Sequence, residues 1–402
     1  MDFSNKKIVV AGIGGVGGLL GACLCETYPH VYFVARGKKK DILKEHGLIL
    51  ESEAFGHKEV RPFMVTDQPS EIGEADIVFI CVKNYSLDQM CGELKCIVGK
   101  DTIIVPVLNG VEHGDKCREA FPFARVVDAL IYTISGCDEN CVVTQKGGYS
   151  HVHVGTESED ERIKSAVSEA AALIKGAGID CIVEENIKTA LWTKYLTNCS
   201  FNILTSAFRA TVGELRANPQ AVEDMRELLE EAYFIARRKG VPLPANLVEE
   251  RMNFFLHTQA ADGTSSMKRD IDAGRQTELE TFSGYLLREA EELTLNIPRT
   301  RHYYNEIRAI LNPEADAPMV WGSMDYDSLM GNLKFAQENF GKDSKEAATC
   351  MYALGQYYIN HGDAFKAMDY LGDALYIRKS IYDDDSLRIK EILNALEVTT
   401  FM

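Results

Sequence analysis

Three polar side chains recur along one face of an otherwise apolar segment, and their types suit an anionic or carbonyl-bearing ligand. Residues 187–205 (IKTALWTKYLTNCSFNILT) predict one helix, and the spacing of Lys194, Asn198 and Asn202 places all three on the same face. One ammonium beside two neutral amides, with no carboxylate in the stripe, leaves positive charge for such a ligand. The alternative is a lysine that snorkels at a domain boundary beside two amides whose hydrogen bonds are satisfied within the protein.

A glycine-rich turn near the start of the chain predicts a dinucleotide phosphate site. The apolar strand expected over Lys7–Gly12 leads into a G-x-G-x-x-G motif, and a helix is expected over residues 18–26. In this setting glycine permits the tight turn and the close approach of a phosphate, while the helix N-terminus offers N–H groups and a positive dipole. The candidate cofactor-binding residues of the motif are Gly12, Ile13, Gly14, Gly15, Val16 and Gly17. The alternative is a glycine-rich turn without a ligand.

The end of the second expected strand, His30–Ala35, favours a phosphorylated cofactor. NAD-binding chains usually carry an acidic residue near this point for the ribose 2′-hydroxyl, whereas an arginine accommodates the 2′-phosphate of NADP. Here the strand runs into Arg36 and then into a lysine run at 38–40. We therefore expect NADPH/NADP+ with Arg36 as the main contact, while the lysines are equally consistent with solvated surface charge.

Two further expected strands, Ala75–Val82 and Thr102–Leu108, each deliver polar residues at the C-terminal end. Ligands of an open parallel sheet bind outside the carboxyl ends of its strands. Lys83 and Asn109 are therefore candidates for the junction between cofactor and substrate. Taken singly, each is also consistent with an ordinary loop residue.

From about residue 186 the pattern is helical, and the loop Asp262–Met267 interrupts it. Ser265 or Ser266 is in position to cap a helix, which needs no further function. Glu278 lies in a segment expected to be helical from Thr277. An acid in the first turn of a helix favours the helix dipole, and this is the alternative to a functional role for Glu278.

Together these motifs resemble those of the ketopantoate reductases (2-dehydropantoate 2-reductases) over about residues 7–312. In chain order, the motifs are GIGGVG, Val82-Lys83, Leu108-Asn109-Gly110, Lys194-x3-Asn198-x3-Asn202, and Ser265-Ser266-Met267 with Thr277-Glu278-Leu279. The resemblance implies an α/β Rossmann-type N-terminal domain followed by an all-α catalytic domain. It also implies NADPH-dependent reduction of 2-dehydropantoate to (R)-pantoate, a step of pantothenate and coenzyme A biosynthesis.

The resemblance further implies a role for each matched residue. Lys194 corresponds to the general acid that protonates the carbonyl oxygen, and Glu278 to an acid that orients the substrate hydroxyl and the active-site network. The positions that match substrate-binding residues of the family are Asn109, Asn198, Asn202 and Ser266. Outside the glycine motif, three positions match cofactor contacts: Arg36 at the 2′-phosphate, Lys83 near the nicotinamide and Asn109 at the junction of cofactor and substrate. Two positions depart from the family pattern: Gly18 stands where Ala is frequent, and Glu280 where Asp is common. Neither is a catalytic position.

The resemblance and the helical pattern give three expected domains: an NADP-binding domain at 1–184, a helical substrate domain at 185–313 and a helical extension at 314–402. The extension contains an internal repeat, in which Leu333, Phe340, Asp343 and Ser344 recur 42 residues later as Leu375, Tyr382, Asp385 and Ser386. It resembles the tetratricopeptide (TPR) repeats of kinesin light chains, and its small residues at 355, 367 and 374 would let two helices approach closely. Residues 314–319 are expected to form a linker. One alternative is that the extension is an appendage, packed either on the reductase domain or on a second subunit. The other is that it forms a groove that binds a peptide or protein partner.

Composition narrows the possible partners. The net charge of −17 over 402 residues argues against a nucleic-acid or anionic-membrane partner, and no apolar run is long enough to span a membrane. The eleven cysteines lack CxxC or Cys/His spacing, so we expect reduced thiols, no metal site and a cytoplasmic protein without a signal peptide. The small-molecule partner is a 2-oxo acid, and a homodimer is left open. The rival hypotheses are a reductase of another branched 2-oxo acid and a non-catalytic NADP sensor that signals through its extension.

Overall fold

The structure is a computed structural model that describes residues 1–312, 325–382 and 386–400. The chain divides into two compact units, Met1–Tyr195 and Leu196–Met402. This division falls within helix α6 (Ile187–Ala207), which spans the polar-striped segment predicted to be helical. The linker expected at 314–319, and Asp385 of the expected repeat, lie outside the described residues.

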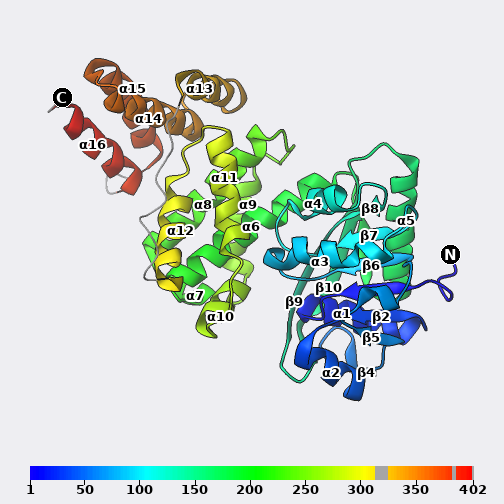
Figure 1. The fold of residues 1–402 in the computed structure, drawn as a ribbon. Coiled ribbons are helices and arrows are strands. Elements are labelled where there is room, and N and C mark those ends of the chain that lie inside the picture. Colours follow the sequence, from blue (N-terminus) through cyan, green and yellow to red (C-terminus); the bar gives the residue numbers. More distant parts are fainter. Residues whose placement is uncertain (313–324, 383–385, 401–402) are drawn as a thin grey trace. The chain divides into compact units, whose positions relative to one another are not determined.

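The N-terminal unit contains a six-stranded parallel sheet, ordered β5-β2-β1-β6-β7-β8 (Figure 1). Its strands are β1 (Ile8–Ala11), β2 (Val31–Val34), β5 (Met64–Thr66), β6 (Ile77–Ile80), β7 (Ile103–Pro106) and β8 (Arg125–Val126). Four of the expected strands, β1, β2, β6 and β7, are therefore present, each trimmed by one or more residues at its ends. Their apolar runs are continuous because both faces of a parallel sheet are covered.

Helices cover the two faces of this sheet with separate apolar clusters. Ile8 and Val10 pack in one cluster with α1 (Gly15–Thr27) and α5 (Glu161–Gly176), which are mostly apolar on their inner sides. Val9 and Ala11 point the other way, because successive strand residues alternate, and pack with side chains of helices α3 and α4. Helix α3 spans Leu87–Leu94 and α4 spans His113–Ala120. Helix α2 (Gly37–His46) adds Leu43 to the first cluster, and its partly buried Ile42 packs against that cluster.

A second, five-stranded sheet belongs to the same unit and includes strands that the sequence analysis did not predict. Two of its strands, β9 (Asp128–Cys137) and β10 (Val142–Gly155), form a long antiparallel hairpin. β10 also pairs with β11 (Asp180–Val183) and with β3, so the sheet order is β11-β10-β3-β4 with β9 beside β10. The unpredicted strands are β3 (Leu48–Ser52) and β4 (Gly56–Val60).

The described residues of the C-terminal unit form helices joined by turns and loops, with no strand among them. After α6 come α7 (Val212–Arg216), α8 (Pro219–Arg238), α9 (Leu247–Asn253), α10 (Ser266–Asp272), α11 (Tyr285–Glu292) and α12 (Pro298–Leu311). Two single turns are π-helical: η4 (Phe254–Thr258) and η5 (Glu280–Gly284). The all-α prediction for this part of the chain is confirmed.

The described part of the extension contains four helices, and each of them packs on the next. They are α13 (Tyr326–Phe340), α14 (Lys345–Asn360), α15 (Ala364–Ile381) and α16 (Leu387–Thr400). The predicted close approach occurs at Gly355, where an added Cβ would lie 2.6 Å from side-chain atoms of Leu371. Ala367 and Ala374 are fully buried in the same region. The extension is therefore helical as expected, and its likeness to TPR repeats stays a prediction.

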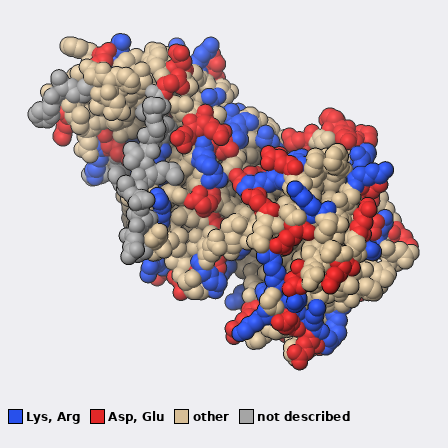
Figure 2. All heavy atoms as spheres, viewed as in Figure 1, with Lys and Arg blue, Asp and Glu red and all other residues tan. Residues whose placement is uncertain are grey.

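The surface and the cysteines add two observations. On the face drawn in Figure 2, acidic and basic side chains are interspersed, and no broad basic expanse appears on that face. Among the described helices, none is both long and apolar enough to cross a membrane. All eleven cysteines are free thiols, and Cys96 is the exposed one.

Candidate active site

The glycine motif lies between β1 and α1 and has the geometry of a phosphate cradle. Gly12 has a φ of +95°, which side chains rarely adopt, and a Cβ at Gly17 would lie 2.0 Å from the Gly12 carbonyl oxygen. A Cβ at Gly14, in contrast, would meet nothing within 4 Å. Gly14 also N-caps α1 without a side-chain cap, so the N–H groups of the first turn have no such partner. These residues fit a dinucleotide cofactor, because the cradle is open where a phosphate would approach the helix N-terminus.

The glycine at position 18, where the family often has alanine, is explained by close packing. A Cβ on Gly18 would lie 2.4 Å from Cγ2 of Val143 in β10. The hairpin of the second sheet thus approaches α1 closely at this point, and an alanine would need Val143 to move.

Arg36, the predicted 2′-phosphate contact, forms an ion pair in this structure. It lies just after β2, and its Nη2 is 2.9 Å from Oε2 of Glu93 on α3. The other carboxylate oxygen of Glu93 accepts a hydrogen bond from Gln89 Nε2 at 3.1 Å. The Arg36 side chain remains 44% exposed, so the pair contributes at most about 1 kcal/mol and can be exchanged for another anion.

Two of the three lysines after Arg36 have fixed partners within the N-terminal unit. Lys40 pairs with Asp67 at 2.8 Å, and Lys39 Nζ donates to the carbonyl oxygen of Ile13 at 2.9 Å. Lys39 therefore ties α2 to the glycine motif.

The carboxyl ends of β6 and β7 bring Lys83 and Asn109 to the same edge of the sheet. The two strands pair in register, Ile80 beside Pro106, and Lys83 N-caps the 3-10 turn Asn84–Ser86. Buried Asn84 then donates from Nδ2 to the carbonyl oxygen of Asn109 at 2.6 Å. This bond holds the loop after β7 against the loop after β6.

Lys194 meets this edge. Its Nζ lies 3.4 Å from Oδ1 of Asn109 and 5.9 Å from the ring centroid of Tyr132 on β9. The structure thus joins the two predicted residues Lys194 and Asn109, which are 85 positions apart. Tyr132 was not predicted, because a tyrosine in a strand carries no signal of its own.

His113 is a second unpredicted residue of this region. It is fully buried on α4 and its Nε2 lies 3.2 Å from the carbonyl oxygen of Ala129. Burial lowers the pKa of His113 to about 4, and the charge of Lys194 acts in the same direction. His113 is therefore uncharged at neutral pH and adds no positive charge beside Lys194.

In the C-terminal unit, Asn202 holds the turn that carries Ser266. Oδ1 of Asn202 accepts from Met267 N at 3.1 Å and from Ser266 Oγ at 3.3 Å, and its Nδ2 donates to the Asn198 carbonyl at 2.8 Å. Asn202 is only 4% exposed. Ser265, and not Ser266, caps α10 by accepting from Lys268 N. Asn202 thus positions Ser266, a role that its spacing on α6 did not reveal.

Glu278 is buried directly before the helical segment that was expected to include it. Helical structure begins at Leu279, and the Glu278 carbonyl accepts from the N–H groups of Thr281 and Phe282 at 3.0 and 3.1 Å. The π-helical turn η5 follows at once. Such turns are frequent at functional sites, since the extra residue re-aims the side chains beside it.

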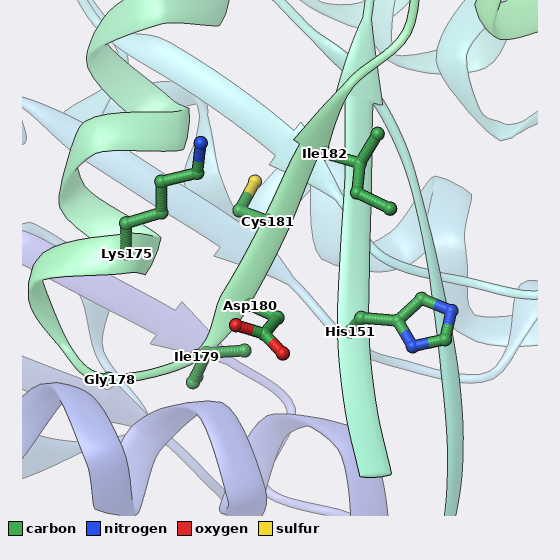
Figure 3. A pocket seen from close by; sticks show the side chains of 7 residues that line it. All are labelled: His151, Lys175, Gly178, Ile179, Asp180, Cys181 and Ile182. Carbon is green, nitrogen blue, oxygen red and sulfur yellow. The ribbon is translucent and has the colours of Figure 1, made fainter.

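Each unit carries a surface hollow. The first, of about 580 Å³, lies beside β11 and is lined by His151, Lys175, Gly178, Ile179, Asp180, Cys181 and Ile182 (Figure 3). It contains none of the predicted residues, and burial raises the pKa of Cys181 to about 11, so the thiol is not a nucleophile at neutral pH. The second, of about 560 Å³, lies within the C-terminal unit and includes Thr277 and Leu279, the neighbours of Glu278.

Comparison with known proteins agrees with this geometry. The family models "Ketopantoate reductase PanE/ApbA" and "Ketopantoate reductase PanE/ApbA C terminal" match residues 8–159 and 186–311. An uncharacterized oxidoreductase, YkpB, of Bacillus subtilis (strain 168) is 30% identical over 304 residues, which are 75% of this chain and 98% of the relative. A 2-dehydropantoate 2-reductase of Archaeoglobus fulgidus is 25% identical over 309 residues, 76% of this chain and 98% of the relative.

Solved structures give the same result. The 2-dehydropantoate 2-reductase of Methylococcus capsulatus superposes with a TM-score of 0.68 at 26% identity, covering 77% of this chain and 98% of that one. A D-mandelate dehydrogenase, solved with NADH and anilino(oxo)acetate, has the same fold, with a TM-score of 0.69 at 20% identity over 76% of this chain and 99% of that one. The family models end at residue 311, so the extension lies outside them. The chain belongs to the ketopantoate reductase PanE/ApbA family, whose members are oxidoreductases that use nicotinamide dinucleotides.

Proposed function

We propose that this chain reduces the C2 carbonyl of 2-dehydropantoate with NADPH and that Lys194 is the general acid. The observation that carries the proposal is the contact between Lys194 Nζ and Asn109 Oδ1, 3.4 Å apart at the carboxyl edge of the parallel sheet. Ligands of such sheets bind at that edge, so an ammonium held there is placed for a substrate oxygen.

In the proposed reaction, each residue of the N-terminal unit has a role that follows from its chemistry. Nicotinamide, when bound, supplies the hydride. Lys194 supplies the proton and stabilises the negative charge that develops on the carbonyl oxygen, a contribution of about 10²–10⁴-fold for a positioned donor. Asn109 orients the Lys194 ammonium through its side-chain oxygen, while its backbone is held by Asn84.

In the C-terminal unit, Asn198 and Ser266 are proposed to bind the substrate carboxylate and hydroxyl. Neutral amide and hydroxyl groups hold these oxygens without changing the proton balance at Lys194. Asn202 acts on the substrate through Ser266, whose turn it fixes. Glu278 is proposed to orient the substrate hydroxyl, as its match to the family motif implies.

For the cofactor we propose NADPH, with the 2′-phosphate held by Arg36 and Lys83 on the nicotinamide side. A phosphate oxygen would replace Glu93 as the partner of Arg36, and the exposure of that pair makes the exchange feasible. The glycine residues 12–17 would hold the pyrophosphate at the N-terminus of α1.

A second candidate substrate is another 2-oxo acid. It is favoured by Tyr132, whose ring stands 5.9 Å from the Lys194 ammonium and gives the site an aromatic wall. The Bacillus subtilis relative, at 30% identity, is itself an oxidoreductase of unassigned substrate.

The test is NADPH oxidation with 2-dehydropantoate beside 2-oxoisovalerate, pyruvate and phenylpyruvate, each also with NADH. We expect the highest kcat/KM for 2-dehydropantoate with NADPH. A higher kcat/KM for another 2-oxo acid would replace the substrate and keep the site. NADPH binding without turnover of any 2-oxo acid would contradict the proposal and favour the sensor hypothesis.

A further inference from the structure

One face of α8 contacts the C-terminal extension from Glu223 to Arg238, within one compact unit. The covered positions recur at i, i+4, i+7, i+11 and i+15, which is one stripe of a helix. They are Glu223, Glu227, Glu230, Phe234 and Arg238. Each contacts a residue of the segment 332–388, so docking extends over about four helical turns.

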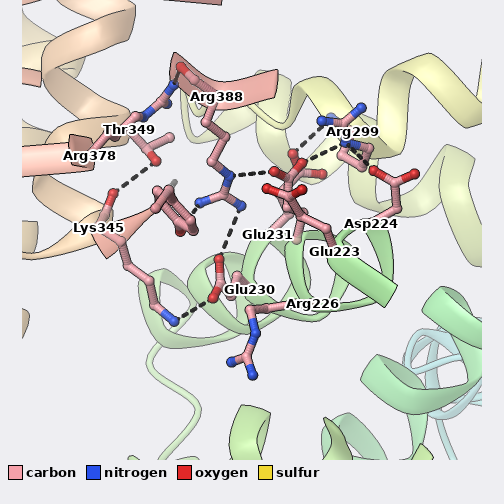
Figure 4. Close-up of polar contacts among 12 residues, drawn as sticks. Glu223, Asp224, Arg226, Glu230, Glu231, Arg299, Lys345, Thr349, Arg378 and Arg388 are labelled. Atoms are coloured by element: carbon pink, nitrogen blue, oxygen red, sulfur yellow. Dashed lines mark hydrogen bonds and ion pairs between the residues drawn. The ribbon is translucent and has the colours of Figure 1, made fainter. Parts of the chain in front are cut away.

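Two acids of α8 meet two bases of the extension at the centre of this stripe (Figure 4). Arg388 of α16 donates from Nε to Glu227 at 2.7 Å and from Nη2 to Glu230 at 3.0 Å, and Lys345 of α14 pairs with Glu230 at 2.5 Å. Glu227, Glu230 and Arg388 are each at most 8% exposed. Burial raises the pKa of Glu227, but the charges of Arg388 and Arg299 outweigh it and lower the pKa, so the carboxylate stays ionised.

Further contacts fix both ends of the stripe. Ser386 Oγ donates to Glu223 at 2.9 Å, and the rings of Phe234 and Phe340 meet edge to face at 5.9 Å between centroids. Aromatic pairs in this geometry add to the stabilisation from burial itself.

At the far end, a buried amide of the extension closes a strained turn. Arg238 Nε donates to Oδ1 of Asn332, and the Arg238 guanidinium lies 4.8 Å from the Phe335 ring centroid. Nδ2 of Asn332 donates to the carbonyl oxygens of Leu293 and Thr294, and Thr294 has a φ of +52°. Asn332 is 1% exposed and uses its whole amide in the interface.

Glu227 links this interface to α12. One of its oxygens accepts from Arg388, and the other accepts from Arg299 Nε at 2.5 Å near the start of α12. From α12, Tyr304 donates its hydroxyl proton to Glu280 at 2.6 Å, in the turn that follows Glu278. The extension is thus linked through α12 to the turn that follows Glu278.

We infer that helices α13 to α16 are a permanently docked part of the C-terminal unit, which fits the charged stripe of α8 and braces α8 and α12. The inference does not depend on the proposed reaction. Exposed ion pairs exchange easily, whereas removing one partner of a buried pair leaves an uncompensated charge. Such an interface favours an appendage over a freely hinged peptide-binding module.

The test is hydrogen exchange by mass spectrometry on the full-length chain and on Arg388→Met. In the wild type, α8 and α13–α16 should share high protection. In Arg388→Met, amides of α8 and α16 should exchange about 10²-fold faster, because two carboxylates lose a buried partner. Lys366→Met is the matched control: it removes a charge on the exposed side of α15 and should leave α8 unchanged. Arg388→Lys should restore part of the protection.

Glu230→Gln provides a milder variant should Arg388→Met fail to fold. Both ion pairs of Glu230 are to the extension, so this substitution should speed exchange in the extension and α8 while the glycine-motif peptides stay as in the wild type. The inference would be overturned if wild-type α13–α16 exchanged far faster than α8. Unchanged α8 protection in both Arg388→Met and Glu230→Gln would also overturn it.

Discussion

The two units use polar side chains in opposite ways. At the carboxyl edge of the N-terminal sheet, Lys194 and Arg36 carry partly exposed charges. In the C-terminal unit, Glu227 and Arg388 are buried and have their hydrogen-bonding groups occupied by other parts of the chain. Residue type therefore does not distinguish a ligand site from a structural network. The difference is how deeply the charge and its partners are buried.

The largest effect is expected at the glycine motif, where one substitution should prevent folding and another should weaken only cofactor binding. Gly17→Ala would place Cβ 2.0 Å from the backbone oxygen of Gly12, so we expect a loss of folded protein, beyond the roughly 1–3 kcal/mol typical of overpacking. Gly14→Ala meets nothing within 4 Å, so its thermal stability should match the wild type while NADPH affinity falls about tenfold. Thermal melts and cofactor titration by fluorescence measure both. Unchanged NADPH affinity in Gly14→Ala would show that the cradle is only a turn.

His113 should make the N-terminal unit sensitive to acid. Its pKa is about 4 in the folded state against 6.5 for an ordinary histidine, so the unfolded chain binds a proton first as the pH falls. Stability is then fully present above pH 6.5 and is lost between pH 6.5 and 4, by about 3 kcal/mol for such a shift. Urea unfolding of the wild type and His113→Gln at several pH values measures this. The variant should lose most of the slope, whereas exposed His46→Gln should keep it.

Asn202 tests the assignment of a positioning role. Asn202→Ala leaves the Met267 N–H buried without its acceptor, so we expect a loss of about 1–3 kcal/mol in stability. KM for the 2-oxo acid should rise as the Ser266 turn loosens, with NADPH affinity unchanged. Asn198→Ala should raise KM without the loss of stability. Equal stability of the two variants would contradict the distinction.

The smallest effect concerns the exposed pair of Arg36 and Glu93. Glu93→Gln removes the competing carboxylate, so binding of 2′,5′-ADP should tighten by a few-fold, in keeping with at most about 1 kcal/mol for an exposed pair. Arg36→Ala should weaken it, and 5′-AMP should be unaffected by either change. Calorimetric titration with the two nucleotides measures the difference. Tighter 5′-AMP binding in Arg36→Ala would instead indicate that NADH is the cofactor.

Local sequence patterns predicted much of the fold and of the candidate site. The parts that were not predicted depend on partners far apart in the sequence. The glycine motif and the helix with Lys194 were predictable because strand, turn and helical periodicity are properties of short segments. Glu93 lies 57 residues from Arg36, and Met267 lies 65 residues from Asn202, so no local signal could have paired them. The strands Leu48–Ser52 and Gly56–Val60 were missed: they pair with each other, and the first also pairs with β10, a partner far along the chain that no local pattern indicates. The interface between α8 and the extension was likewise invisible, since acids at helical spacing are typical of a solvated face.

Lys194 is the residue on which the proposed reaction depends most, and one measurement tests its role directly. Single-turnover oxidation of bound NADPH by 2-dehydropantoate should be compared in the wild type and in Lys194→Gln, with cofactor affinity measured on the same samples. We expect equal NADPH affinity and a rate at least about 10²-fold lower in the variant, because the proton donor is lost while the cradle is intact. A rate within twofold of the wild type would contradict the role of Lys194 and the proposed active site with it.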